Sequence, residues 1–262
     1  MPAKSKLGQN FLRDTAAIER IVAALGDCST RTVVEIGPGK GAITHLLADR
    51  AKQVVAVEVD PQLAEGIRTS FPAGQVTVVE QDVLSFDFAA VAANAGEKLL
   101  VVGNLPYYIT SPILLKLAAS HAVLERAVLM VQREVADRVA AEPGSRDYGV
   151  LSVTAQMYGP VTPLFTLPPS AFSPPPEVHS TVFRWHFAPR FEELGVEEES
   201  FLALVKQVFA QKRKTLANNL RAAGYEPACI SVALQQAGIN ATARAEVLGL
   251  EQLATLWRTL KK

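Results

Sequence analysis

The sequence predicts an α/β fold, in which a doubly wound parallel sheet is joined to a small helical domain at the C-terminal end. Three observations lead to this prediction. Short runs of apolar, mainly β-branched residues alternate with segments long enough to form helices. The first four of these runs end in polar residues, at the edge where a parallel sheet binds its ligands. After an acidic stretch at residues 190–200, apolar residues recur at helical spacing.

The composition limits the class of protein and its partners. A chain of 262 residues can form one large domain, or one large and one small domain. Its 26 Lys and Arg balance 26 Asp and Glu, so nucleic-acid binding would have to come from a local basic patch. Cys28 and Cys229 match no metal-ligand or disulfide spacing, and we expect no bound metal. We also expect a cytoplasmic protein, because neither a signal sequence nor a membrane-spanning run is present.

The chain begins with a short basic arm, residues 1–12, which contains Lys4 and Lys6. A frayed terminus is the alternative interpretation of this segment. Asp14 is expected to cap a helix, because the apolar residues that follow it recur at helical spacing. Gly26 is expected to end this helix.

A glycine-rich turn follows the first predicted strand. The strand covers residues 31–36, the turn Gly-Pro-Gly-Lys-Gly covers 37–41, and a helix is expected at 42–50. Glycines here allow positive φ angles and a close approach of a ligand, and the helix start offers free N–H groups. The pattern GxGxG fits neither the dinucleotide-binding GxGxxG nor a P-loop. A purely structural turn is therefore the alternative.

Acidic residues follow the next two predicted strands. Glu58 lies in the strand 53–59, about 20 residues beyond the glycine turn, where an acidic residue can accept both hydroxyls of a ribose. Asp60 instead suits the N-cap of the next helix. Asp82 follows the strand 76–79, where it could accept from an adenine amine while the Val83 N–H donates to the ring.

The fourth predicted strand, residues 99–102, leads into Asn104-Leu105-Pro106-Tyr107. The Asn104 side chain has an acceptor oxygen. Pro106 favours an extended Leu105 and has no N–H, which leaves the Leu105 carbonyl free to accept. Two acceptors beside the flat ring of Tyr107 suit a planar ring with an exocyclic amine, such as adenine. The alternative is an ordinary turn in which the asparagine bonds the local backbone.

The remaining segments of the large domain are predicted from the same patterns. We expect helices at 112–119 and 132–141 and strands at 126–131, 148–158 and 181–187. The proline-rich segment 163–176 excludes a helix and a central strand. It predicts a rigid, ordered loop that holds Phe172 in place.

The C-terminal part is predicted to be mostly helical, with helical segments at residues 201–209 and 211–221 and later helices at about residues 227–237 and 249–260. Basic residues form a local positive face with no acidic residue before Glu226. A solvated helix face is the alternative interpretation. The members of this face are Lys206, Lys212, Arg213, Lys214 and Arg221.

Taken together, the motifs resemble the small-subunit ribosomal RNA adenine dimethyltransferases over nearly the whole chain. In chain order they are QNFL at 9–12, EIGPGKGAIT at 35–44, VEVD at 57–60, QDVL at 81–84, NLPYYI at 104–109, VQREVADR at 131–138, YGVLSV at 148–153, FSPPPEV at 172–178 and QKRKTLANNL at 211–220. The last three are typical of this family more than of methyltransferases in general.

The resemblance implies a Rossmann-like, S-adenosylmethionine-dependent methyltransferase sheet of seven strands at residues 1–188 and a helical RNA-binding domain at 189–262. The implied reaction is dimethylation at N6 of two adjacent adenosines in a 3′-terminal hairpin loop of small-subunit ribosomal RNA. S-adenosylmethionine would be the cofactor and an immature 30S-type subunit the partner. We expect a monomer, with no membrane partner.

The resemblance also assigns roles to individual residues. Those implied to bind the cofactor are Gln9, Asn10, Leu12, Glu35, Gly37, Gly39, Gly41, Glu58, Val59, Asp82, Val83 and Asn104. Those implied to hold the target base are Asn104, Leu105, Pro106, Tyr107 and Phe172, the last as a second stacking wall. The candidates for RNA contact are Lys4, Lys6, Arg133, Arg138, Lys206, Lys212, Arg213, Lys214 and Arg221.

Other functions are weighed against this one. A methyltransferase of large-subunit ribosomal RNA, as in macrolide resistance, is disfavoured by the proline-rich loop and by QKRKTLANNL. DNA adenine methylation is disfavoured because no separate target-recognition domain is present. From a different class, a non-catalytic ribosome-assembly factor would bind the same RNA without modifying it.

Overall fold

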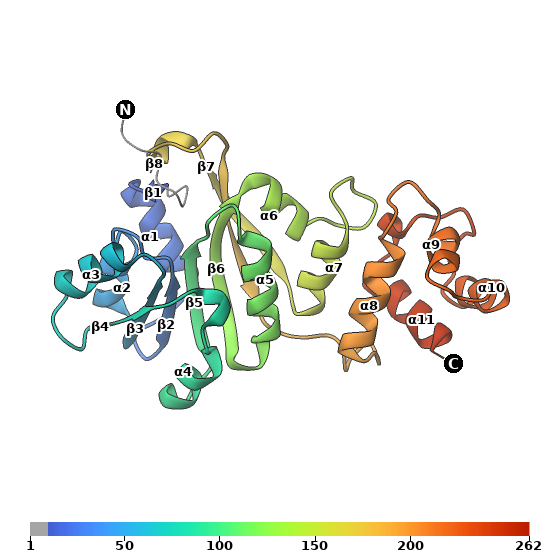
Figure 1. Cartoon of the computed structure of the whole chain (residues 1–262), viewed down its shortest axis with the longest axis horizontal. Coiled ribbons are helices and arrows are strands. Elements are labelled where there is room, and N and C mark those ends of the chain that lie inside the picture. The colour runs from blue at the N-terminus through green and yellow to red at the C-terminus, as the bar shows by residue number, and fades with distance from the viewer. Residues whose placement is uncertain (1–9, 262) are drawn as a thin grey trace. The chain divides into compact units, whose positions relative to one another are not determined.

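A seven-stranded sheet organises the first part of the chain (Figure 1). In the computed structural model, which describes residues 10–261, the strand order is β4-β3-β2-β5-β6-β9-β7. The parallel strands are β2 (Thr32–Ile36), β3 (Gln53–Glu58), β4 (Val76–Glu80), β5 (Leu99–Asn104) and β6 (Leu124–Gln132). Strands β9 (Ser180–His186) and β7 (Val161–Leu167) are antiparallel to their neighbours. The predicted seven-stranded α/β sheet is thereby confirmed.

The central strands are buried along their whole length, as expected for parallel strands covered on both faces. All five residues of β2 are buried, and β5 is buried up to its last residue, Asn104. Glu35, a charged residue in the middle of the apolar strand β2, is also buried.

Helices α1 (Thr15–Ala24), α2 (Thr44–Arg50), α3 (Pro61–Ser70), α4 (Phe88–Ala95) and α5 (Thr110–Ala119) connect the strands. The predicted caps are confirmed. The Asp14 carboxylate accepts from the Ala17 N–H at 3.0 Å, and Asp60 accepts from the first N–H groups of α3. Each cap fixes where a helix begins, and Asp60 therefore also fixes where the chain leaves β3.

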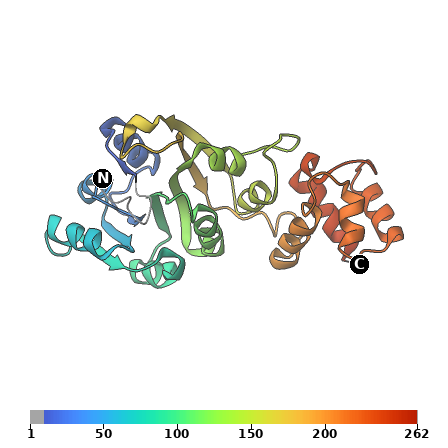
Figure 2. The same cartoon turned by 45° about the horizontal axis from the view of Figure 1, so that its top comes forward.

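A second, two-stranded sheet joins distant segments of the chain. Strand β1 (Phe11–Leu12) pairs antiparallel with β8 (Phe172–Ser173), and the two lie side by side in both views (Figures 1 and 2). The Arg13 N–H extends this pairing by donating to the Ala171 carbonyl at 2.8 Å. The start of the described chain is thus attached to the proline-rich segment.

The structure corrects two predicted elements. Residues 148–158, predicted as a strand, contain helix α7 (Val150–Met157). Most of this helix is buried, so its apolar residues do not mark a single face and their spacing is ambiguous. Residues 163–167, predicted as part of a loop, belong to β7. This strand tolerates Pro163 because it lies at the edge of the sheet, where the pairing shifts register between Pro163 and Phe165.

Two compact units divide the chain. The first contains residues up to 136 and 161–187, and the second contains 137–160 and everything from 188 onward. Residues 137–160 therefore belong to the same unit as the C-terminal helices, whereas the predicted boundary between residues 188 and 189 placed them in the first domain. The helices of the second part are α8 (Glu198–Val208), α9 (Leu216–Ala222), α10 (Pro227–Gln236) and α11 (Leu250–Leu260), and α6 (Arg133–Val139) spans the division at 136. Between residues 10 and 261, no helix has the length and apolar character needed to cross a membrane.

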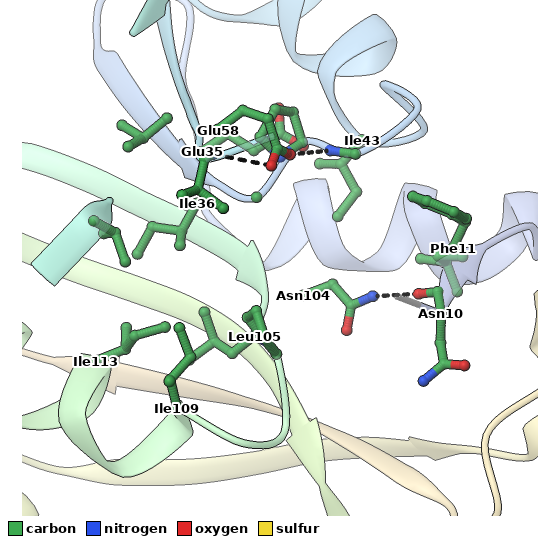
Figure 3. Close-up of a pocket in the computed structure, with 18 of the residues that line it drawn as sticks. Asn10, Phe11, Glu35, Ile36, Ile43, Glu58, Asn104, Leu105, Ile109 and Ile113 are labelled. Carbon is green, nitrogen blue, oxygen red and sulfur yellow. Dashed lines mark hydrogen bonds between the residues drawn. The ribbon is translucent and has the colours of Figure 1, made fainter. Parts of the chain in front are cut away.

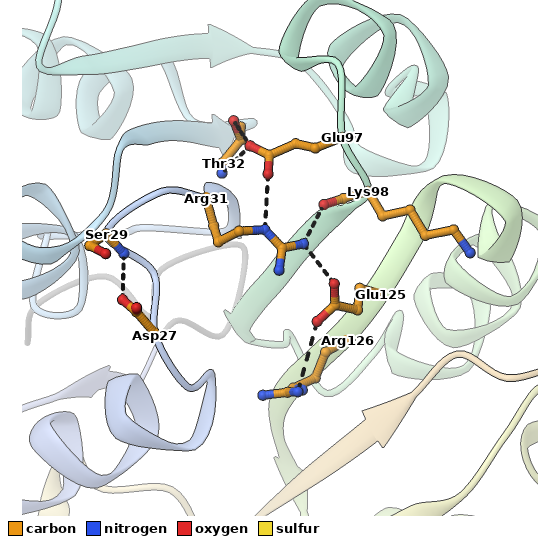
Figure 4. A network of polar contacts seen from close by, with 8 residues as sticks. All are labelled: Asp27, Ser29, Arg31, Thr32, Glu97, Lys98, Glu125 and Arg126. Carbon is orange, nitrogen blue, oxygen red and sulfur yellow. Dashed lines mark hydrogen bonds and ion pairs between the residues drawn. The ribbon is translucent and has the colours of Figure 1, made fainter.

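A network of charges ties together the amino ends of the central strands (Figure 4). The Arg31 guanidinium donates to Glu97 at 2.9 Å, to Glu125 at 2.8 Å and to the Lys98 carbonyl at 2.8 Å. The hydrogen bond and charge of Arg31 lower the pKa of the Glu125 carboxyl. These partly buried charges satisfy one another. The side chains at the amino ends of the central strands therefore bind each other.

Candidate active site

A cavity lies at the opposite edge, at the carboxyl ends of β2, β3, β4 and β5 (Figure 3). Its volume is about 1060 Å³ when the open mouth is included. The predicted residues that line it are Asn10, Leu12, Glu35, Gly37, Gly39, Glu58, Val59, Asp82, Val83, Asn104, Leu105, Pro106 and Tyr107. Gln9, which was also predicted, lies outside the described residues. The structure thus brings together side chains from five separate segments of the sequence.

Several lining residues were not predicted. Ile43, on the side of Glu35 and Glu58, and Ile109 and Ile113, on the side of Leu105, give the cavity apolar surface (Figure 3). Phe11 and Tyr108 also line it. Sequence reasoning missed the isoleucines because apolar residues at the start of a helix, such as Ile43 and Ile109, or within one, such as Ile113, usually belong to the core. Tyr108 carried a signal in the sequence, because it follows Tyr107 directly in the motif NLPYYI. In the structure this residue is 60% exposed.

The glycine turn forms one wall of the cavity. Gly37 and Gly39 have φ angles of +66° and +58°, which L side chains rarely adopt. A Cβ atom at Gly39 would lie 3.0 Å from the Phe11 ring, so the missing side chain makes room for β1. Gly41 does not line the cavity; a Cβ atom there would meet Ile67 at 3.0 Å. The structure therefore places Gly41 in the packing behind the turn.

Glu58 at the end of β3 is 4% exposed and is held by backbone donors. One carboxylate oxygen accepts from the Gly39 N–H at 3.1 Å, and the other accepts from the N–H groups of Val59 and Asp60 at 3.0 Å each. A carboxylate has about four lone-pair sites, so capacity to accept remains. Val59 lies beside it with its side chain 51% exposed, which leaves an apolar surface at the mouth of the cavity.

Glu35 in β2 is 2% exposed, and its Oε2 atom accepts no hydrogen bond from the described residues. Burial raises the pKa of this carboxyl to about 7; the Thr44 hydroxyl acts in the opposite direction, and the negative charge of Glu58 raises the pKa further. A buried acceptor without a partner is costly. This side of the cavity is therefore suited to a ligand that presents a positively charged donor.

Asp82 and Val83 follow β4, the strand that pairs with β3. Asp82 is exposed, and its carboxylate accepts from the Leu84 N–H at 2.9 Å, which starts a short 3-10 turn at Val83–Ser85. Val83 itself is buried. The turn thereby holds Asp82 at the rim of the cavity.

Asn104, at the end of β5, is bound to the segment that precedes β1. Its Nδ2 atom donates to the Asn10 carbonyl at 3.0 Å, and its oxygen points away from Asn10 (Figure 3). The side-chain oxygen is thus the end of the amide that remains to accept a hydrogen bond. The next residue, Leu105, donates its N–H to the Met130 carbonyl at 2.9 Å, while its own carbonyl accepts from none of residues 10–261.

Tyr107 lines the cavity, and its hydroxyl forms a hydrogen bond with Ser180. This hydroxyl and the Ser180 Oγ lie 2.8 Å apart, and Ser180 is completely buried at the start of β9. Burial raises the pKa of the Tyr107 hydroxyl, and the bond to Ser180 acts against this. The ring is therefore neutral and fixed at its far end.

The structure does not bring Phe172 to the cavity. Its side chain is 4% exposed and packs in the core with Leu12 and Ala171, because β8 pairs with β1 at this position. The second stacking wall implied by the resemblance is not formed in this arrangement.

The predicted basic face lies in the second unit. Its residues Lys206, Lys212, Arg213, Lys214 and Arg221 are all exposed. Residues 212–214 do not continue a helix as predicted: α8 ends at Val208, and the buried Asn219 side chain donates to the Val208 and Gln211 carbonyls across the turn. The three charges are therefore presented by a turn between two helices.

Four other predicted basic residues lie elsewhere. Arg133 and Arg138 are exposed on α6. Lys4 and Lys6 lie outside the described residues. Between residues 10 and 261, no group of three or more His, Cys, Asp or Glu side chains is arranged to hold a metal ion.

Comparisons with known proteins agree with the motifs. A family model described as ribosomal RNA adenine dimethylase matches residues 2–262. The chain is 62% identical over 259 residues to the ribosomal RNA small subunit methyltransferase A of Acidobacterium capsulatum, with 98% of this chain and 91% of that protein covered. It is 50% identical to the protein of the same name from Koribacter versatilis, with 99% and 95% covered.

Solved structures show the same fold. The 23S rRNA methyltransferase ErmE is 27% identical with a TM-score of 0.74, and 97% of this chain and 100% of that chain are covered. A dimethyladenosine transferase from Plasmodium falciparum has a TM-score of 0.79 at 23% identity, with 94% and 95% covered. The latter likeness concerns the fold alone.

Proposed function

The chain belongs to the ribosomal RNA adenine dimethylase family, and from this premise we propose that it transfers methyl groups from S-adenosylmethionine to N6 of adenosines in small-subunit ribosomal RNA. The observation that carries the proposal is the pair of acceptors, Asn104 Oδ1 and the Leu105 carbonyl, at the tip of β5 beside Tyr107. We propose as its target two adjacent adenosines in a 3′-terminal hairpin loop of an immature subunit, modified by a monomer in the cytoplasm.

The residues of the cavity suit the proposed cofactor. S-adenosylmethionine supplies a methyl group on a positively charged sulfur, and its methionine part also carries an ammonium group. The unpartnered Glu35 oxygen would accept from a cationic donor, and Glu58 would accept from the ribose hydroxyls. Asp82 and the Val83 N–H would bind the adenine of the cofactor, with Val59 against its face.

The chemistry asked of the protein is mainly positioning. The lone pair of an adenine N6 amine is delocalised into the ring, which makes the amine a poor nucleophile. Hydrogen bonds from its two N–H groups to Asn104 Oδ1 and the Leu105 carbonyl would favour a pyramidal nitrogen aimed at the methyl group. The base must leave the RNA stack to reach them, and stacking on Tyr107 would offset part of that cost. After one transfer a single N–H remains, so the second round requires space for a methyl group.

Glu35 is expected to make cofactor binding depend on pH. Its pKa is about 7 in the free protein, and a cationic ligand beside it would lower that pKa. The complex then binds fewer protons than the free protein. Affinity should rise with pH to about pH 7 and level off above it, and close to one proton should be released per cofactor bound near pH 6. Titration calorimetry in two buffers with different ionisation enthalpies measures this number.

The control for this pH dependence is Glu35→Gln, which keeps the shape of the side chain and cannot ionise. Any proton uptake or release by other groups, including the cofactor amine, remains in this variant. The difference between wild type and variant therefore belongs to Glu35. Equal proton release in the two proteins would contradict the prediction.

Replacing Lys212, Arg213 and Lys214 by alanine is expected to weaken RNA binding. All three side chains are exposed on one turn, where they can lie along phosphates. For a single-stranded loop, each lost phosphate contact makes the slope of log affinity against log salt less steep by about 0.7. The slope of the triple variant should therefore be less steep than that of the wild type by roughly 2. Binding to a labelled ribosomal RNA hairpin at several salt concentrations measures this slope.

The control variant removes two positive charges at the amino ends of the strands, on the side opposite to the cavity. Lys52 and Lys98 are exposed beside the amino ends of β3 and β5, away from the cavity. The double variant Lys52→Ala, Lys98→Ala should leave the slope close to that of the wild type. If the turn variant behaves like this control, residues 212–214 are ordinary surface.

The proposed function as a whole is tested by methyl transfer to ribosomal subunits. Tritiated S-adenosylmethionine is supplied with purified small or large subunits that lack adenine methylation, and the modified nucleoside is identified by mass spectrometry. We expect N6,N6-dimethyladenosine in the small subunit only. Product in the large subunit would instead support the activity named for ErmE, and binding without product would support an assembly factor.

A further inference from the structure

The segment around β1 lines the cavity and also binds the side chain of Asn104. An asparagine amide has a donor end and an acceptor end of almost the same shape, and little but its hydrogen bonds decides which end faces a given partner. In Asn104 the donor end is bound to the Asn10 carbonyl at 3.0 Å. In the reversed orientation, two oxygen acceptors would face each other there with no proton between them. The Asn10 carbonyl therefore selects the orientation in which Oδ1 is presented.

The position of that carbonyl is set by contacts on both sides of β1. Phe11 and Leu12 pair with Ser173 and Phe172, and Arg13 continues the pairing through the Ala171 carbonyl. Leu12 is 5% exposed, in the core cluster that also contains Phe172.

The opposite side of β1 meets the glycine turn. The Phe11 ring occupies the space that a Cβ of Gly39 would need, and the Lys40 ammonium lies 4.8 Å from the centre of the same ring. The segment before β1 is thus fastened to the proline-rich segment on one side and to the glycine turn on the other.

We propose that β1, held by β8, is a positioning strand for methyl transfer: through the Asn10 carbonyl it keeps the Asn104 oxygen directed at the target amine. The inference rests on the proposed function of Asn104. It assigns a role to two features that the proposed chemistry does not use, the pairing of β1 with β8 and the burial of Phe172. Asn10 and β1 act here through Asn104 and need not touch the target base.

The test removes the hydrogen bond that extends the pairing of β1 with β8, without changing a residue that lines the cavity. Arg13→Pro removes the N–H that binds Ala171, and Arg13→Ala keeps it; the Arg13 side chain is exposed and does not line the cavity. In Arg13→Pro we expect the single-turnover rate of methyl transfer at saturating S-adenosylmethionine to fall about tenfold, the effect of losing one ordinary hydrogen bond. The dissociation constant of S-adenosylmethionine should change less than about threefold. Arg13→Ala should match the wild type.

A spectroscopic readout follows the hydrogen bond itself. In the ¹⁵N-labelled full chain, the side-chain NH2 signals of Asn104 are assigned by their loss in Asn104→Ala. We expect them to be protected from solvent exchange in the wild type and in Arg13→Ala, and to lose that protection in Arg13→Pro. This measurement requires no RNA, so it separates failure of the inference from failure of the proposed function.

Three outcomes would overturn the inference. The Asn104 signals could remain protected in Arg13→Pro, the signals could lose protection without a change in rate, or Arg13→Ala could lose as much activity as Arg13→Pro. Should Arg13→Pro not fold, Phe11→Ala gives a second test, because it removes the contact with the glycine turn and leaves every backbone hydrogen bond of β1 available. The same joint loss of protection and rate is expected, and its absence would refute the proposal.

Discussion

Asn104→Ala is expected to lower the rate of methyl transfer by about 10²- to 10³-fold, the usual effect of removing one positioned hydrogen-bonding group from a reaction centre. The variant loses the side-chain oxygen that remains free to accept at the end of β5. The dissociation constant of S-adenosylmethionine should stay near that of the wild type, because Glu35 and Glu58 are untouched. Single-turnover transfer to unmethylated small subunits and titration calorimetry measure the two quantities.

Asn94→Ala is the matched control for this prediction, because Asn94 is an exposed asparagine on α4 that does not line the cavity. It should transfer methyl groups at the rate of the wild type. A loss of cofactor binding in Asn104→Ala, in parallel with the loss of rate, would show that Asn104 serves the cofactor and not the target amine. Thermal unfolding of both variants shows whether the Asn10 contact also affects stability.

The parts of the site that could be predicted from sequence are those encoded locally. Glycines directly after a buried strand, an acidic residue at the end of the next one, and Asn104 after β5 each lie within a few residues of the strand that positions them. Because parallel strands share one carboxyl edge, each such residue reaches the cavity once the sheet forms. Glu58 and Asn104 both line it, as the strand order requires.

The contacts between distant segments could not be predicted in this way. Strands β1 and β8 contain two residues each, too few for any periodicity, and their partners are about 160 residues apart along the chain. The bond between Asn10 and Asn104 likewise spans 94 residues. Phe172 is an example. Its motif implied a stacking role at the target base, whereas its burial beside Leu12 depends on the pairing of β1 with β8, which no local pattern predicts.

At two other places the structure differs from the predicted secondary structure because a side-chain hydrogen bond favours a conformation other than the one that the apolar pattern suggests. Residues 150–157 form a helix although their apolar residues also fit a strand, and Ser152 favours the helix by accepting from the Gly149 N–H at 3.1 Å and donating to the Arg138 carbonyl. At residues 212–214 the helical pattern continues in sequence, but the Asn219 side chain binds the Val208 carbonyl at 2.7 Å and stabilises a turn. In both places a buried polar side chain binds backbone groups and stabilises the observed conformation.

Glu58→Ala is expected to raise the dissociation constant of S-adenosylmethionine by about 100-fold, since hydrogen bonds to a charged group are stronger than neutral ones and a ribose would form two. The substitution also leaves the N–H groups of Gly39, Val59 and Asp60 without their acceptor. Part of the loss therefore comes from a less ordered glycine turn. Titration calorimetry with S-adenosylmethionine measures the affinity, and circular dichroism shows whether the fold is kept.

Glu80→Ala is the matched control, because Glu80 lies opposite Glu58 in the adjoining strand, with its side chain 41% exposed and paired with Arg68 at 3.3 Å. It does not line the cavity, and its removal should leave the affinity for S-adenosylmethionine unchanged. At saturating cofactor, Glu58→Ala should recover much of its transfer rate, since Asn104 and Leu105 are intact. An unchanged dissociation constant in Glu58→Ala would exclude Glu58 from the ribose site, and a rate that saturating cofactor does not restore would mean that the glycine turn also positions the reacting groups.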